Sequence, residues 1–171
     1  MDKNIIVRNA TPQDATGISI VQAYTWGTAY KGLMPDSVLE RRITGTKANS
    51  DRLESIIESG RFKYVVAEYK GAVVGFASYG KSRDENYPRR GEIGALYVLK
   101  GFAGCGTGRA LFEFSAQKLK QLGYTAMIIN CLTGNPSVEF YKHMGGIIAG
   151  QRTDRIFDGH TITEDILKFE L

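Results

Sequence analysis

The chain has 171 residues, of which 43% are hydrophobic and 23% are charged, a balance typical of globular proteins and unlike that of disordered or fibrous chains. Lys and Arg outnumber Asp and Glu by 22 to 18, which gives a formal net charge of +4. This small excess favours an anionic ligand such as a phosphate-bearing cofactor, but it is too weak to indicate a nucleic-acid partner.

The N-terminal sequence MDKNIIVRNA lacks the apolar core of a signal peptide. The most apolar internal stretches, 126–129 and 145–150, are too short to span a bilayer. Cys105 and Cys131 form neither a CxxC pair nor a disulfide framework, which fits a reducing compartment. We therefore expect a soluble, cytoplasmic protein without a membrane partner. Two histidines and no clustered cysteines predict no metal site.

The first part of the chain is predicted to be a strand followed by helices. Residues 4–8 are short and β-branched, as in a strand. Thr11-Pro12-Gln13-Asp14 combines an N-cap residue, proline at the first helical position and an early acid, and predicts a helix to about Tyr30. A second helical region is expected over 36–59, with an interruption at 44–47.

The rest of the chain is predicted to alternate strands with two further helices. Lys70-Gly71 is a tight-hairpin signal. The expected elements are strands at 63–69, 72–79 and 92–99, a glycine-rich loop at 101–108, a helix at 109–121, a strand at 125–130, a helix at 137–144, and closing strands at 146–152 and 161–170. This order predicts one domain over residues 1–171, of the α/β or α+β class.

The glycine-rich loop is the most informative segment. Four glycines, at 101, 104, 106 and 108, lie between a strand and a helix. Such a loop lets backbone N–H groups converge on an anion, and the helix N-terminus adds a favourable dipole. A diphosphate is the natural ligand, although glycine spacing alone fits a strand-to-helix turn equally well.

Two nucleotide-binding patterns fail at specific residues of this loop. A P-loop would need a lysine directly after Gly106, where the chain has Thr107. A dinucleotide fingerprint starting at Gly104 would need glycine at position 109, where the chain has Arg109.

The segment Ala103-Gly104-Cys105-Gly106-Thr107-Gly108 instead resembles the acetyl-CoA motif of the GNAT superfamily of N-acetyltransferases, Gln/Arg-x-x-Gly-x-Gly/Ala. It follows the strand residues Leu96-Tyr97-Val98 and precedes a helix that starts at Arg109. Ala103 departs from the pattern. Residues 135–146 are similar to a second family segment, and the residues that carry this similarity are Asn135, Phe140, Tyr141 and Gly145.

The resemblance implies a GNAT-like fold, with a twisted, mixed, mostly antiparallel sheet of six to seven strands and about four flanking helices. The central strands 92–98 and 125–130 would run parallel and splay apart, with acetyl-CoA between them. The implied cofactor-binding residues are Leu96, Tyr97, Val98, Ala103, Gly104, Cys105, Gly106, Thr107, Gly108, Arg109, Asn135 and Tyr141.

The resemblance also implies an activity. An acetyl-CoA-dependent N-acetyltransferase transfers an acetyl group to a primary amine of a small molecule or peptide by direct attack in a ternary complex, and a base and an acid assist. Glu92 is the candidate base, because some family members carry a glutamate base at this position and partial burial would strengthen it. The alternative is a structural carboxylate paired with Arg89 or Arg90.

Tyr141 is the candidate general acid, because family members often place a tyrosine here that faces the CoA sulfur. The alternative is a core tyrosine beside Phe140. Trp26 and Tyr30 lie four residues apart on one helix face and, together with Glu92, are candidates for binding the acceptor through cation–π contact. Ordinary core packing is the competing interpretation of these two aromatic residues.

A catalytically silent acyl-CoA-binding regulatory module is the alternative function. Ala103 favours it, whereas the presence of both Glu92 and Tyr141 favours an enzyme. The sequence leaves the acceptor open among polyamines, antibiotics, amino acids and proteins. A homodimer is compatible with the resemblance.

Overall fold

The computed structural model describes residues 4–60, 62–157 and 159–171. Within these ranges a seven-stranded sheet has the order β1-β2-β3-β4-β5-β7-β6. The strands are β1 (Ile6–Asn9), β2 (Lys63–Tyr69), β3 (Ala72–Lys81), β4 (Gly91–Val98), β5 (Ala126–Leu132), β6 (Ile147–Phe157) and β7 (His160–Glu170). The α-helices are α1 (Ala15–Ala29), α2 (Asp36–Thr44), α3 (Thr46–Ser59), α4 (Thr107–Gln121) and α5 (Ser137–His143), with 3₁₀ turns η1 (Pro12–Asp14) and η2 (Lys100–Phe102).

The helices before β2 follow the predicted stop and start signals. The Thr11 and Asp14 side chains form a reciprocal capping box around η1, which leads into α1. Gly45 ends α2 and also precedes α3, so the expected second helical region divides into two helices. The described residues therefore contain five α-helices rather than about four.

The sheet is antiparallel except at its centre. β1 to β4 pair antiparallel in sequence order, and Lys70 and Gly71 adopt positive φ angles of 50° and 80° in the predicted tight hairpin. β4 and β5 pair in parallel, and β7 lies between β5 and β6. This arrangement confirms the predicted mixed sheet with two parallel central strands.

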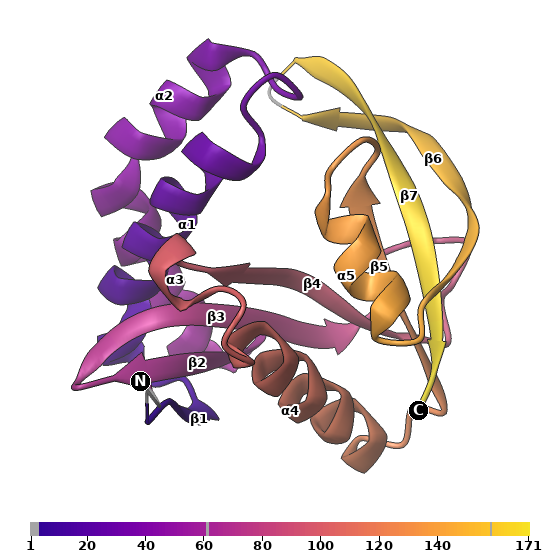
Figure 1. Cartoon of the computed structure of the whole chain (residues 1–171), viewed down its shortest axis with the longest axis horizontal. Coiled ribbons are helices and arrows are strands. Elements are labelled where there is room, and N and C mark those ends of the chain that lie inside the picture. The colour runs from indigo at the N-terminus through magenta and orange to yellow at the C-terminus, as the bar shows by residue number, and fades with distance from the viewer. Residues whose placement is uncertain (1–3, 61, 158) are drawn as a thin grey trace.

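Helices cover both faces of the sheet (Figure 1). On one face, Ile18 and Val21 of α1 and Leu53 of α3 pack with Val66 and Phe76 of the sheet. On the other face, the α4 residues Leu111, Phe112 and Leu119 belong to a larger cluster that includes Met127 and Phe169.

A third cluster joins the two halves of the molecule. Trp26 of α1 and Val38 and Leu39 of α2 pack with Ile162 of β7. The first helices therefore reach across the open side of β4 to the far half of the sheet, and this position encloses the pocket described below.

Candidate active site

The two central strands separate along their length. β4 and β5 pair at two positions only, the second of which joins Glu92 to Ile128, although β4 continues to Val98 and β5 to Leu132. Figure 1 shows the ends of these strands pointing in different directions. Beyond Glu92, the edge of β4 that faces β5 does not pair with β5. This is the predicted splay between the two parallel strands.

The glycine-rich loop presents unused hydrogen-bond donors beside this splay. Gly104 and Gly106 have φ angles of 73° and 86°, which glycine adopts without steric cost. Within the described residues, the backbone N–H groups of Gly104, Gly106, Thr107, Gly108 and Arg109 have no protein acceptor, as expected where a helix begins. These five donors lie at the positive end of the α4 dipole and suit a phosphate group.

The side of the loop that its glycines face is open. A Cβ atom placed on Gly101, Gly104 or Gly106 would meet no other atom within 4 Å. The Ala103 N–H is used internally, since it donates to the Lys100 carbonyl at 3.2 Å. The loop thus has both the donors and the room for a diphosphate, supplied by its backbone.

Side chains around the loop are anchored within the protein. The exposed Cys105 directs its Sγ to the Phe102 carbonyl oxygen at 3.0 Å. Arg109 places its Nη2 3.2 Å from Nε2 of His143 and so connects α4 to α5. These contacts hold the loop against the first turn of α4.

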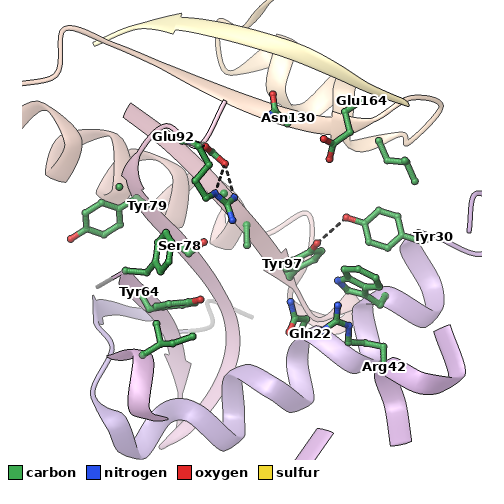
Figure 2. Close-up of a pocket in the computed structure, with 18 of the residues that line it drawn as sticks. Gln22, Tyr30, Arg42, Tyr64, Ser78, Tyr79, Glu92, Tyr97, Asn130 and Glu164 are labelled. Atoms are coloured by element: carbon green, nitrogen blue, oxygen red, sulfur yellow. Dashed lines mark hydrogen bonds and ion pairs between the residues drawn. The ribbon is translucent and has the colours of Figure 1, made fainter. Parts of the chain in front are cut away.

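A pocket of about 370 Å³ lies over β4, with walls from α1, α2, α3, β3, β5 and β7. The three predicted acceptor-site residues, Trp26, Tyr30 and Glu92, all line it. The rings of Trp26 and Tyr30 meet edge to face at 5.0 Å, and the Tyr30 hydroxyl lies 2.8 Å from that of Tyr97 (Figure 2). Burial raises the pKa of Tyr30 and of Tyr97, so both hydroxyls are protonated at neutral pH.

Glu92 is 4% exposed and forms an ion pair with Arg83, whereas the alternative interpretation paired it with Arg89 or Arg90. Its Oε1 accepts hydrogen bonds from Arg83 Nη2 at 2.6 Å and Nε at 3.2 Å, and its Oε2 accepts the Arg83 backbone N–H at 2.7 Å. Burial acts to lower the pKa of the Arg83 guanidinium, but its hydrogen bonds to Glu92 and the charge of Glu92, with smaller contributions from Tyr64 and Glu164, together raise this pKa.

The Arg83–Glu92 ion pair lies beside Gly94, which forms a β-bulge in β4. Ser78 pairs with Ala95 and Tyr79 with Ile93, which leaves Gly94 without a partner on β3. A Cβ on Gly94 would lie 2.5 Å from Arg83 Nη2, a separation that non-bonded atoms do not reach. The missing side chain of Gly94 is therefore what allows the guanidinium to lie over β4.

Tyr141 lies in the core beside the splay. It is 7% exposed and packs edge to face on Phe140 at 5.3 Å. Burial, with smaller contributions from Cys131 and Tyr97, raises the pKa of Tyr141. Its hydroxyl forms no hydrogen bond to another described residue. The residues that line the pocket around Glu92 do not include Tyr141.

Asn135 has a local structural role. It is buried, and its Oδ1 accepts the Ser137 backbone N–H at 2.9 Å at the start of α5. This is an Asx-turn that leads into α5, whose N-cap residue is Pro136.

Sequence reasoning missed Arg83, Asn130 and Glu164, which the structure adds to the pocket. Arg83 and Glu92 meet because the loop folds back, with the Ser82 N–H donating to the Arg90 carbonyl at 2.9 Å. Glu164 is 7% exposed and stands next to the buried Asp165 in β7, between Ile162 and Ile166. An acid in such a strand was the available signal for this residue.

The sequence profile of the Acetyltransferase (GNAT) family matches residues 30–145. The chain belongs to this family. Among its GNAT relatives is the uncharacterized N-acetyltransferase YuaI of Bacillus subtilis, which is 34% identical over 138 residues, or 81% of this chain and 78% of YuaI.

Solved GNAT structures share the fold. The PaiA N-acetyltransferase of Thermoplasma acidophilum, in complex with coenzyme A, has a TM-score of 0.75 at 14% identity over 98% of this chain and 99% of its own. YncA of Salmonella typhimurium, with its cofactor acetyl-CoA, has a TM-score of 0.71 at 19% identity over 98% of this chain and 94% of its own. The likeness confirms the predicted GNAT-like fold.

The described residues contain no group of three or more His, Cys, Asp or Glu side chains placed to hold a metal ion. In the same ranges, no helix has the length and apolar character needed to cross a membrane.

Proposed function

We propose that the protein is an acetyl-CoA-dependent N-acetyltransferase that transfers the acetyl group to a primary amine by direct attack in a ternary complex. The observation that carries the proposal is the set of five backbone N–H groups from Gly104 to Arg109 that lack protein acceptors beside the splayed strands. Membership of the GNAT family and the coenzyme in two structural relatives support the same cofactor.

The chain would hold the cofactor mainly by its backbone. The donors at 104–109 would bind the diphosphate, and the unpaired edge at Leu96–Val98 would pair with the pantetheine arm. Ala103 offers no side-chain donor, so the backbone at this loop would supply the binding energy. When bound, acetyl-CoA supplies the acetyl group as an activated thioester.

Glu92 would accept the proton that the amine loses. A carboxylate has about four lone-pair sites, and Arg83 occupies three of them. The remaining site on Oε2 is available to the amine or to one bridging water. The Arg83 hydrogen bonds also fix the carboxylate in orientation, which general-base catalysis requires.

Tyr141 would return a proton to the departing thiolate. Its raised pKa keeps the hydroxyl protonated, and because the hydroxyl forms no hydrogen bond to another described residue, that proton is available. A buried phenol of this kind is suited to donate a proton to an anion that forms beside it.

The same observations allow a second function, a catalytically silent acyl-CoA-binding module. Glu92 accepts three hydrogen bonds from Arg83. A carboxylate with a purely structural role would be hydrogen-bonded in the same way. This function predicts cofactor binding without turnover.

One experiment separates the two functions. The purified protein is mixed with acetyl-CoA and a panel of primary amines, and release of the free thiol is followed, while thermal melting reports CoA binding. The enzyme hypothesis expects thiol release that depends on the amine. Stabilisation by CoA without thiol release from any amine favours the silent module.

Variants then test the two residues. Glu92→Gln and Tyr141→Phe are each expected to lower kcat by about 100-fold or more. Glu58→Gln and Tyr24→Phe are matched controls, because both wild-type residues are exposed on helices away from the pocket. Full rates in both test variants would remove Glu92 and Tyr141 from these roles.

A further inference from the structure

Basic side chains outnumber acidic ones in the acceptor pocket. The basic residues that line it are Arg42, Arg52, Lys81 and Arg83, and the acidic residues are Glu92 and Glu164. Arg83 neutralises Glu92 directly, with 2.6 Å between Nη2 and Oε1. A polycationic acceptor would therefore enter a pocket whose net charge repels it.

Arg42 is separated in space from Glu164 and from the Arg83–Glu92 ion pair. Figure 2 shows Glu92, Asn130 and Glu164 on the side of β5 and β7, and Gln22 and Arg42 on the side of α1 and α2. The hydroxyl pair of Tyr30 and Tyr97 lies between the two groups. The pocket thus has an end rich in hydrogen-bond acceptors and an end that carries positive charge.

The acceptor-rich end contains an oxygen that lacks a donor. The Oδ1 atom of Asn130 is buried and receives no hydrogen bond within the described residues. Buried polar atoms in native proteins nearly always have a partner, so this oxygen points to an N–H group of a ligand. A substrate amine is such a group, and Glu164 adds a negative charge on the same side.

The positive end is built from two helices. The Arg42 guanidinium stacks on the Trp26 ring, with 4.2 Å from Cζ to the ring centroid, and this contact holds it at the pocket wall. Arg52 of α3 also lines the pocket. It donates from Nη2 to Asn49 Oδ1 at 2.9 Å, and Asn49 Nδ2 donates to Gln22 Oε1 at 3.0 Å, so Arg52 lies on the side of Gln22 and Arg42. Planar guanidinium groups are well matched to carboxylates.

We infer that the acceptor is a small amine that also carries a carboxylate, as an amino acid does. Its amine would lie toward Asn130 and Glu164, and its carboxylate toward Arg42 and Arg52. The inference rests on the proposed acetyltransferase function. A volume of about 370 Å³ suits one small molecule.

Acceptor pairs that differ only in charge test this inference. Each of the common amino acids is compared with its C-terminal amide, and spermidine is included, with thiol release measured at saturating acetyl-CoA. For the amino acids that react, kcat/KM is expected to be at least tenfold higher for the acid than for the amide. An amide or spermidine that reacts as well as every acid would overturn the inference while leaving the acetyltransferase function intact.

Variants locate the positive end. Arg42→Gln and Arg52→Gln are each expected to raise KM for the acid by about tenfold and to leave KM for the amide unchanged. Arg41→Gln removes the same charge from an exposed residue of α2 outside the pocket and should behave as wild type. Equal effects on acid and amide would contradict the assignment, and thermal melting checks that each variant folds.

No thiol release with any acceptor, despite stabilisation by CoA, would refute the acetyltransferase proposal and with it this inference. By contrast, turnover of amines that lack a carboxylate, with none of the acids reacting, would refute only the proposed recognition of a carboxylate.

Discussion

Replacing Arg83 with glutamine should destabilise the protein by an amount that follows from the burial of its partner. The variant loses the Nε and Nη2 hydrogen bonds and leaves the charge of Glu92, whose side chain is 5% exposed, without its counter-ion. Stranding a buried charge costs roughly 3–5 kcal/mol. The Arg83 side chain is 52% exposed, so water screens part of this effect, and we expect about 2 kcal/mol.

Unfolding in urea and thermal melting measure this change. For a chain of this size, a loss of about 2 kcal/mol lowers the melting temperature by roughly 4–8 °C. The electrostatic origin is tested by the double variant Arg83→Gln/Glu92→Gln, because the second substitution removes the stranded charge. We expect the double variant to recover about 1 kcal/mol relative to Arg83→Gln alone.

Two results would refute this reasoning. The first is an Arg83→Gln protein within about 0.5 kcal/mol of wild type, the range of ordinary surface substitutions. The second is a Glu92→Gln substitution that costs the same free energy with and without Arg83, because an additive pair carries no coupling.

Three other changes follow from the structure. Gly106→Ala places a side chain at a φ of 86°, which costs about 1–2 kcal/mol in urea unfolding and should weaken CoA binding in titration calorimetry by displacing the loop donors. The pKa of Tyr141 is raised, so kcat for thiol release should not fall as pH rises through about 10, the ordinary pKa of a tyrosine. A fall of kcat in this range that is present in the wild type and absent in Tyr141→Phe would contradict the assignment. Burial acts to raise the pKa of Asp14, but hydrogen bonds from Arg8 and Thr11 outweigh it and the pKa is lowered. Its stabilisation is therefore present above about pH 3.9 and is lost as pH falls through the folded value, so Asp14→Asn should cost about 1–2 kcal/mol at pH 7 and converge with wild type in acid unfolding experiments.

The backbone around the proposed cofactor site was predicted well because its signals are local. The hairpin at Lys70-Gly71, the helix break at Gly45 and the glycines before α4 each act on the backbone within a few residues. The parallel pair and its splay were predicted from the family resemblance alone, and the residues that carry this resemblance are those of the glycine-rich loop and of residues 135–146.

The acceptor side could not be predicted in the same way. Arg83 reaches Glu92 only because the loop between them folds back, and the nearby Arg89 and Arg90 are equal candidates in sequence. Asn130 and Glu164 come together because β7 inserts beside β5, and such a strand order does not follow from local propensity.

This difference has a consequence for how specificity is encoded. The proposed CoA contacts are backbone N–H groups whose positions depend on the fold, whereas the acceptor pocket is built from side chains of separate helices and strands. Arg42 and Arg52 protrude from α2 and α3, so their replacement changes charge without moving the glycine-rich loop. Acceptor selectivity and coenzyme affinity should therefore change independently, and Arg42→Gln/Arg52→Gln should bind CoA as wild type does in titration calorimetry.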